Sequence, residues 1–310
     1  MKKDFLSIAD LSKVEIYEIF DLAGRLKAQT HTREPHQHLA GYSLAMIFAK
    51  PSTRTRISFE TGIFQLGGMG LYLAPQDIGI GTREAVKDVA RVISRYNDMI
   101  MARLFDHAHI EELAEYASVP VINGLTDYNH PCQIMADAFT ILEHRGTLED
   151  LKIVYIGDGN NIAHSWINFA GRLPINLVIC SPQNYHPDSE TFQNAHQAGL
   201  SKLEIIQDPL EAVKDADVLY TDVWASMGQE AEAAERKRIF MPYQVNSELL
   251  SHASKGALVM HCLPAHRDEE ITDEVLESPA SIVFDEAENR MHVQKAIMVK
   301  LAEQHAAANS

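Results

Sequence analysis

Cysteine is scarce in this sequence of 310 residues, and the few that are present argue against a disulfide framework. The three cysteines, Cys132, Cys180 and Cys262, lie far apart and form no C-x-x-C pair. Free thiols are typical of reducing compartments, whereas disulfide-rich secreted domains carry many closely spaced cysteines. The sequence also lacks a run of about 18 apolar residues, the length at which a transmembrane helix is expected. Because no apolar signal core follows the N-terminus, we expect a cytoplasmic protein without a membrane partner.

Basic residues are also few. The sequence has 27 Lys and Arg against 43 Asp and Glu, which gives a net charge of −16. This excess of negative charge repels polyanions, so nucleic acid is not an expected partner. The hydrophobic content of 46% and the charged content of 23% are those of a globular protein. Arginines that cluster in so acidic a chain are therefore more informative than they would be in a basic one.

Apolar segments of strand length alternate with helical segments in two consecutive series. The first series contains 44–49, 69–74, 98–104 and 119–124; the second begins at 151 and continues with 175–182, 202–208, 216–224, 256–264 and 281–287. Buried strands that alternate with helices predict parallel sheets covered on both faces, and the length predicts more than one core. We therefore predict the α/β class, with two doubly wound parallel-sheet domains linked by helices. The predicted domains are 1–147 and 148–288, and a last helix at 289–305 packs back against the first domain.

The segment PSTRTR (51–56) follows the first apolar strand and opens an amphipathic helix. The first turn of a helix exposes backbone N–H groups, which attract anions together with the helix dipole. Ser52, Thr53 and Thr55 add hydroxyl groups, and Arg54 adds a planar fork that suits phosphate or carboxylate. The carboxyl end of a parallel strand is also where ligands bind in open α/β sheets. From these residues alone, an anion site and a helix cap with a solvated face explain the segment equally well.

The segment NHPCQ (129–133) follows another apolar strand and opens another helix. His130 and Gln133 are three residues apart, so both side chains can face the same side. A histidine can donate to a carbonyl oxygen, and a glutamine can bind a neighbouring amide. Taken alone, a capping histidine is the better explanation.

Two stretches in the second series also follow apolar strands, DVWASMGQE (222–230) and MHCLPAHR (260–267). A buried carboxylate without a partner is costly, so Asp222 needs a base or a positively charged ligand. Cys262 is either an ordinary core thiol or a nucleophile, and the sequence does not decide between them.

The segment GDGNN (157–161) resembles the turn of a dinucleotide-binding unit, but Ile162 stands where the third glycine should be. It is therefore weak support for a nicotinamide cofactor. We prefer a strand-to-helix turn in which the amides of Asn160 and Asn161 face a ligand.

The segment HTREPHQH (31–38) contains three histidines that could indicate a metal site. Their spacing is irregular, and Pro35 marks a loop. A solvated linker is the better explanation, and no metal site is predicted.

Taken together, four motifs in order resemble the aspartate/ornithine carbamoyltransferase family: STRTR (52–56), HPCQ (130–133), DVWxSMG (222–228) and HCLP (261–264). The last two resemble the ornithine branch, and FDEAENR (284–290) looks like the family's final site segment. The resemblance implies a first domain that binds carbamoyl phosphate, a second that binds L-ornithine, and an active site in the cleft between them. It also implies a homotrimer or a multiple of trimers, with sites at subunit interfaces and no metal or organic cofactor. The products would be L-citrulline and phosphate in arginine metabolism. Biosynthesis is the expected role, although breakdown uses the same chemistry.

Residue by residue, the resemblance implies that Arg103, His130 and Cys262 are catalytic. Arg103 would bridge the phosphate and the carbonyl oxygen, and His130 would donate to that oxygen. The residues implied for carbamoyl phosphate are Ser52, Thr53, Arg54, Thr55, Gln76, Arg103, His130, Gln133, Cys262, Leu263 and Arg290. Those implied for ornithine are Asn161, Asp222, Ser226 and Met227.

One of these residues, Gln76, lies in the loop at 74–84, which in the family reaches the site of a neighbouring subunit. An alignment on Gly81 and Glu84 would instead place Gly79 at the position of the family's glutamine. We also expect a cis Leu263–Pro264 bond in a tight turn.

Carbamoyl phosphate already carries a good leaving group, so the reaction needs positioning and stabilisation of an oxyanion rather than a covalent nucleophile. Three rival functions stay open at this point. One is a transferase for another amine, such as putrescine or an N-acylated ornithine. The second is a binding protein or regulatory subunit with the same fold, and the third is a nucleotide-dependent oxidoreductase that rests on GDGNN alone.

Overall fold

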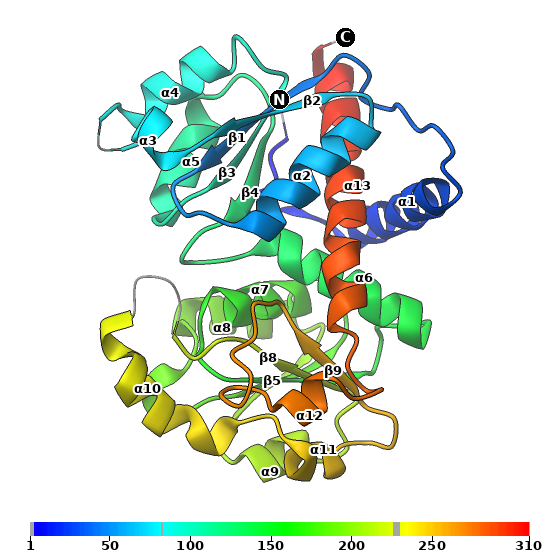
Figure 1. Cartoon of the computed structure of the whole chain (residues 1–310), viewed down its shortest axis with the longest axis vertical. Coiled ribbons are helices and arrows are strands. Elements are labelled where there is room, and N and C mark those ends of the chain that lie inside the picture. The colour runs from blue at the N-terminus through cyan, green and yellow to red at the C-terminus, as the bar shows by residue number, and fades with distance from the viewer. Residues whose placement is uncertain (1–2, 82, 226–229, 310) are drawn as a thin grey trace. The chain divides into compact units, whose positions relative to one another are not determined.

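The computed structural model describes residues 3–81, 83–225 and 230–309, and the chain divides into two compact units. Unit 1 is the chain through Phe139 together with the segment from Glu288 onward, and unit 2 is Thr140–Ala287. The division falls within helices α6 (Pro131–Arg145) and α13 (Val283–Asn309), so each of them contributes to both units. Helices lie on both sides of each parallel sheet (Figure 1), which confirms the predicted fold class.

Unit 1 contains a four-stranded parallel sheet in the order β2-β1-β3-β4. Its strands are β1 (Ser43–Phe48), β2 (Met69–Leu73), β3 (Met99–Arg103) and β4 (Val121–Leu125). Its other elements are η1 (Ile8–Asp10), α1 (Lys13–His31), α2 (Thr53–Gln65), α3 (Pro75–Ile78), α4 (Val86–Ile93) and α5 (His107–Tyr116). The strand order reverses between β1 and β3, and such a switch point is where open parallel sheets bind ligands.

Unit 2 contains a five-stranded parallel sheet in the order β7-β6-β5-β8-β9. Its strands are β5 (Lys152–Ile156), β6 (Asn176–Cys180), β7 (Lys202–Ile206), β8 (Val218–Thr221) and β9 (Leu258–His261). Its α-helices are α7 (Asn161–Ala170), α8 (Ser189–Ala198), α9 (Pro209–Val213), α10 (Ala233–Phe240), α11 (Ser247–Ser251) and α12 (Asp273–Leu276), and its short turns are η2 (Gln183–Tyr185), η3 (Glu230–Glu232) and η4 (Met241–Tyr243). Here the order reverses between β5 and β8, the two strands that precede GDGNN and DVW.

The inner strands are mostly apolar because helices cover both faces of the sheets. Every residue of β3 and β4 is buried, whereas the edge strand β2 is partly exposed at each position. On one face of the first sheet, β-strand residues such as Ile47 and Ile100 pack against Val89 of α4 and Leu113 of α5. The sheets are therefore rigid supports for the loops at their carboxyl ends.

Polar residues explain where several helices begin. Ser12 forms a capping box with Glu15 at the start of α1. At α2, the side chain of Ser52 accepts a hydrogen bond from the backbone N–H of Thr55, so the predicted helix start in the STRTR segment is confirmed.

The predicted strand at 281–287 is wrong. Ser281 forms one isolated bridge with Val259, and α13 begins at Val283. Asp285 and Glu286 lie in the first turn of this helix, where acidic side chains stabilise the helix start. A short apolar run does not distinguish a strand from the first turn of a buried helix, which explains the error.

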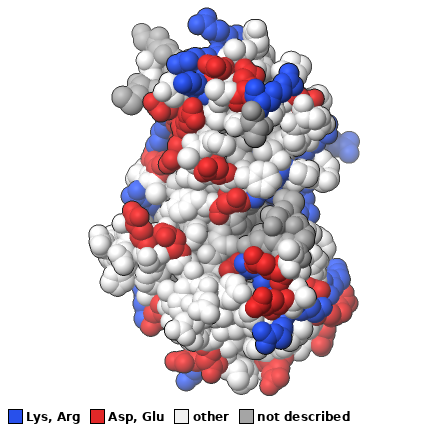
Figure 2. Space-filling view, turned by 90° about the vertical axis from the view of Figure 1, so that its left-hand side faces the viewer, with Lys and Arg blue, Asp and Glu red and all other residues white. Residues whose placement is uncertain are grey.

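Acidic and basic side chains are interspersed on the face seen in Figure 2. Within the described residues, no helix is both long enough and apolar enough to cross a membrane.

Candidate active site

The loop after β1 forms a helix N-terminus at the switch point of the first sheet. Ser52 Oγ donates to Thr55 Oγ1 at 3.1 Å and accepts from the Thr55 N–H at 3.3 Å. Thr53 is exposed in the first turn of α2. This turn therefore presents hydroxyl and backbone N–H groups beside each other, as an anion site requires.

Three arginines and one histidine gather near this turn, and we call Arg54, Arg103, Arg290 and His130 the arginine cluster. Arg290 Nη2 donates to Thr55 Oγ1 at 2.9 Å, although the two residues are 235 positions apart. Arg103 ends β3 and pairs in register with Phe48, the last residue of β1. The fold of unit 1 thus brings together cations that the sequence separates widely.

The positive charge of this cluster affects the pKa of His130. Its side chain is buried, and burial together with the guanidinium groups of Arg290, Arg103 and Arg54 holds its pKa well below the ordinary value. The imidazole is therefore neutral at pH 7, with one N–H donor and one acceptor nitrogen. A neutral donor beside three fixed cations suits an oxygen atom on which negative charge develops.

Arg54 lies in the first turn of α2, and its side chain is half-buried. Its Nε is buried and has no hydrogen-bond partner within the described residues. A buried donor of a charged group costs free energy when it is unpaired, so this guanidinium is arranged for a ligand.

Gln133 lies one helical turn after His130, at the start of α6. Its Nε2 donates to Asp137 Oδ1 at 2.7 Å, and both side chains are buried. The donor end of the amide therefore points to Asp137 and the acceptor Oε1 points away from it, which suits contact with the N–H of another amide.

Lys50 is a residue to which the sequence assigned no role. It directly precedes the PSTRTR segment, its side chain is 6% exposed, and it forms an ion pair with Asp127 in the loop after β4. Its Nζ also lies 4.3 Å from the ring centre of Phe105. Lys50 thus joins the loops that carry Ser52 and His130. A lysine between a buried strand and a helix cap is the sequence signal that could have indicated this role.

Gln76 is exposed on α3. Within the described residues, no hydrogen bond or ion pair links it to the arginine cluster. Its assignment rests on the resemblance alone.

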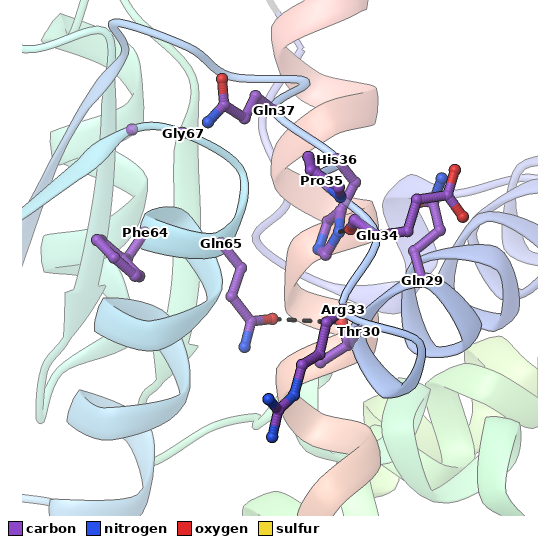
Figure 3. Close-up of a pocket in the computed structure, with 11 residues that line it drawn as sticks. Gln29, Thr30, Arg33, Glu34, Pro35, His36, Gln37, Phe64, Gln65 and Gly67 are labelled. Carbon is purple, nitrogen blue, oxygen red and sulfur yellow. Dashed lines mark hydrogen bonds between the residues drawn. The ribbon is translucent and has the colours of Figure 1, made fainter.

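A cavity of about 500 Å³ in unit 1 is lined by the end of α1, the loop that follows it and the end of α2 (Figure 3). None of the residues of the arginine cluster lines it. This cavity is therefore not the candidate active site.

Unit 2 carries a second cluster at its own switch point, and we call Asp222, Asn160 and Cys262 the Asp222 cluster. Asp222 follows β8 and is 7% exposed. Its Oδ2 accepts from Asn160 Nδ2 at 3.0 Å, and its Oδ1 accepts from the N–H of Val223 at 2.8 Å and from Cys262 Sγ at 3.0 Å. The loops after β5, β8 and β9 therefore meet at one buried carboxylate.

Asn160 differs from the prediction that its amide faces a ligand. Its Oδ1 caps α7 by accepting from the N–H groups of Ile162 and Ala163, while its Nδ2 holds Asp222. Asn161, the first residue of α7, is half-buried.

The glycines of GDGNN are explained by backbone packing. A Cβ on Gly159 would lie 2.3 Å from the backbone nitrogen of Pro187, and the Gly159 N–H donates to the carbonyl oxygen of Tyr185 at 2.8 Å. This close approach requires glycine without any dinucleotide.

Cys262 is held by its hydrogen bond to Asp222. A thiolate at this position would lie against a carboxylate and be repelled by it, whereas a thiol or a cationic ligand is compatible with that neighbour. The geometry therefore favours a role in orienting a ligand over a role as covalent nucleophile.

The backbone of the HCLP segment is fixed by His261. Its Nδ1 accepts from the N–H of Leu263 at 2.8 Å, so its Nε2 carries the proton and donates to Glu270 Oε1 at 3.0 Å. The Leu263–Pro264 bond is cis, as predicted, and Leu263 adopts a φ of 55°.

Arg236 is a second residue that the sequence did not indicate. It is buried, and its Nη1 donates to Asp158 Oδ2 at 2.7 Å and to the carbonyl oxygen of Trp224 at 3.0 Å. Burial raises the pKa of Asp158 even though Arg236 opposes the shift. Arg236 therefore links the loop after β5 to the loop after β8.

Ser226 and Met227, which the resemblance implies for ornithine, lie outside the described residues. The ligand atoms of Asp222, His261 and Cys262 are close enough to hold a metal ion. Both ring nitrogens of His261 already have hydrogen-bond partners, so this set is poorly prepared for one.

Comparison with known proteins extends this picture. Residues 3–143 match the model of the aspartate/ornithine carbamoyltransferase carbamoyl-P binding domain, and residues 149–301 match that of the Asp/Orn binding domain. The chain belongs to the aspartate/ornithine carbamoyltransferase family.

Three relatives illustrate the similarity. The chain is 57% identical to an ornithine carbamoyltransferase of Thermococcus kodakarensis over 96% of this chain and 95% of that one. The structure of ornithine carbamoyltransferase from Pyrococcus furiosus has a TM-score of 0.91 at 51% identity, covering 96% of both chains. That of the anabolic ornithine carbamoyltransferase from Campylobacter jejuni has a TM-score of 0.93 at 39% identity, covering 97% of this chain and 99% of the other.

Proposed function

We propose that this chain is an ornithine carbamoyltransferase, which transfers the carbamoyl group of carbamoyl phosphate to the side-chain amine of L-ornithine and releases L-citrulline and phosphate. The observation that carries the proposal is the presence of one cationic and one anionic buried cluster, each at the switch point of its sheet. The family membership and the names of the relatives agree with this reaction.

We assign carbamoyl phosphate to the domain 1–147, completed by Arg290 on the helix at 289–305. Its phosphate would bind the first turn of α2, with hydroxyl and N–H groups from Ser52, Thr53 and Thr55. Arg54 and Arg290 would neutralise its charge. Gln133 would accept from the carbamoyl N–H, and Gln76 is assigned to the site of a neighbouring subunit.

We assign L-ornithine to the domain 148–288. Asp222 provides the negative charge for an amino group, and Asn161, Ser226 and Met227 are assigned to the amino-acid end of the substrate. Putrescine has no α-carboxylate, so a site for putrescine would not need these residues.

In the proposed reaction, a bond forms between the ornithine side-chain nitrogen and the carbamoyl carbon, and the bond between that carbon and the phosphate oxygen breaks. His130 donates to the carbonyl oxygen, and Arg103 stabilises the negative charge that develops there. The attacking amine has a lysine-like reference pKa of about 10.4, so it must lose a proton first. That first proton passes to solvent before attack. The nitrogen releases a second proton once the new bond forms, and the departing phosphate takes it up, while Cys262 and the backbone of Leu263 orient the amine.

We further propose a homotrimer or a multiple of trimers. Exposed apolar side chains on α2 and on the edge strand β2 support it, namely Ile57, Phe64, Met69 and Leu71. An exposed strand edge with apolar side chains is suited to contact with a second copy of the chain.

A cytoplasmic location is proposed as well, because the three cysteines are free thiols. We propose a role in arginine biosynthesis, in line with the Campylobacter jejuni structure, which is named as an anabolic enzyme.

The proposal is tested by incubating purified protein with carbamoyl phosphate and, in separate reactions, L-ornithine, putrescine, N-acetylornithine or L-aspartate. Ureido product is measured colorimetrically. We expect product with ornithine alone. Product with putrescine instead would show that the assignment of unit 2 is wrong, and no product with any amine would leave a binding protein as the function.

A further inference from the structure

A second group of polar side chains lies in unit 1, where the end of α1 meets α13. It consists of His31 in the last turn of α1 and of Glu288 and His292, four residues apart on α13. Glu288 Oε1 lies 2.7 Å from His31 Nε2 and 3.3 Å from His292 Nε2. His31 belongs to the histidine segment 31–38, for which the sequence predicted no metal site.

The geometry of these three atoms points to a zinc site, and we propose that His31, Glu288 and His292 bind one Zn²⁺ ion. All three ligand atoms lie within 4.8 Å of one another. In a tetrahedral zinc site with bonds of about 2.0–2.1 Å, neighbouring ligand atoms are about 3.3 Å apart, so small side-chain adjustments suffice. Two imidazoles and one carboxylate are a common zinc ligand set and leave the fourth position to water.

The two histidines differ in solvent exposure. His292 is fully buried, whereas the side chain of His31 is 57% exposed and that of Glu288 is 41% exposed. The imidazole ring planes are perpendicular, with centres 6.1 Å apart, so that both Nε2 atoms converge on one carboxylate oxygen. The ion can therefore enter from solvent and bind one ligand that is already fixed in position.

Burial and neighbouring groups shift the pKa values of two of the three side chains. Burial and the Lys295 ammonium lower the pKa of His292 to about 4, so the ring is neutral at pH 7. The pKa of Glu288 is lowered overall, because hydrogen bonds from His31 and His292 outweigh its burial.

Two lysines near the site oppose a cation but are directed to other acceptors. Lys27 Nζ donates to Asn289 Oδ1 at 2.9 Å, and Lys295 Nζ donates to Thr30 Oγ1 at 2.7 Å and to Gln65 Oε1 at 2.8 Å. Thr30 and Gln65 lie beside each other at the cavity of Figure 3. Because of these charges and the open fourth position, we expect weaker binding than in a closed four-ligand structural site.

The consequence of zinc binding would be a link between α1 and α13 within unit 1. A metal that binds the folded chain and not the unfolded one raises the melting temperature. Zinc binding can be measured without enzymatic turnover, so its test does not depend on the proposed reaction.

The test is a titration of metal-free, full-length protein with ZnCl₂ by calorimetry, together with X-ray absorption at the zinc edge. We expect one site with nitrogen and oxygen ligands at about 2.0–2.1 Å and no sulfur at about 2.3 Å. Loss of a hydrogen bond to a metal ligand lowers metal affinity by up to roughly 100-fold, and loss of the ligand itself should lower it further. His31→Ala and Glu288→Gln should therefore each weaken zinc binding by at least about 100-fold.

Two variants serve as matched controls. His38→Ala removes another exposed histidine of the same segment, and His266→Ala alters a separate group of His266, Glu269 and Glu270 that could also attract a metal ion. Both should bind zinc like the wild type and keep its zinc-dependent rise in melting temperature, whereas His31→Ala should lose that rise. Zinc affinity unchanged in His31→Ala, sulfur in the coordination shell, or no zinc binding by the wild type would each overturn the proposal.

Discussion

The arginine cluster of unit 1 and the Asp222 cluster of unit 2 are built in the same way and carry opposite charge. Each lies at the carboxyl ends of parallel strands where the strand order reverses. The first gathers three guanidinium groups around a neutral imidazole, whereas the second gathers an amide and a thiol around one carboxylate. The chain places these two kinds of charge on different units.

This difference shows how little the net charge of a protein says about its sites. The chain has a net charge of −16, yet the arginine cluster in unit 1 is strongly cationic. Carbamoyl phosphate is an anion and the ornithine amine is a cation, so the two clusters match the two substrates in charge. Substitution of Arg54 or of Asp222 should therefore affect the binding of one substrate much more than that of the other.

The largest effect is expected for Arg54→Ala. Loss of a guanidinium that meets the phosphate should lower kcat/KM for carbamoyl phosphate by about 10³-fold, the upper range for removal of one preorganised donor. The matched control is Arg56→Ala, because Arg56 pairs instead with Glu60 at 3.2 Å and stacks over Tyr72. Initial rates of citrulline formation measure both, and equal losses in the two variants would contradict a specific role for Arg54.

Asp222→Asn should affect the other substrate. Removal of the buried negative charge should raise KM for ornithine by about 100-fold, since loss of one partner of a buried charge pair costs about 2–5 kcal/mol. KM for carbamoyl phosphate should change less than threefold, with Glu211→Gln on the exposed side of α9 as control. A parallel rise of both KM values would mean that the clusters do not divide the substrates.

Cys262 sharpens the comparison within unit 2. Cys262→Ala removes the hydrogen bond to Asp222 and should lower kcat about 10-fold, the value of one hydrogen bond to a charged group. Cys262→Ser retains a donor and should recover part of that loss. Full kcat in the alanine variant would remove the thiol from the mechanism and leave only the backbone of this turn.

Lys295 tests whether every buried cation of unit 1 serves the substrate. It lies outside the arginine cluster, bound to Thr30, Gln65 and His36, and burial lowers its pKa to about 8. In the unfolded chain a lysine has a pKa of about 10.4. Between about pH 8 and pH 10.4 the unfolded chain therefore binds more protons than the folded one, so the free energy of unfolding of the wild type should rise with pH in this range.

The measurement for Lys295 is the free energy of unfolding in urea at pH 7.5 and 9.5. Relative to Lys295→Met, the wild type should gain about 2 kcal/mol over this interval. Binding of carbamoyl phosphate should not change. A constant difference between the two proteins would show that Lys295 does not titrate in this range.

The sequence sufficed for what depends on local pattern. Alternating apolar segments predicted two parallel-sheet units, and the STRTR segment predicted a helix start that Ser52 does form. The 281–287 segment was misread because a buried helix start and a short strand share the same apolar pattern.

Long-range contacts could not be predicted in this way. Arg236 reaches the loops of unit 2 from α10, and Lys50 pairs with Asp127 across 77 residues. Nothing in the spacing around these residues specifies a partner that only the fold brings near. The same reason explains why the histidine segment 31–38 showed no metal site, since two of the three proposed ligands come from α13.

The most direct measurement is calorimetric binding of carbamoyl phosphate to the wild type, Arg54→Ala and Asp222→Asn in the absence of ornithine. We predict that Arg54→Ala loses measurable binding, while Asp222→Asn binds as tightly as the wild type. Equal weakening in both variants, or binding that survives in Arg54→Ala, would contradict a division of the two substrates between the cationic cluster of unit 1 and the anionic cluster of unit 2.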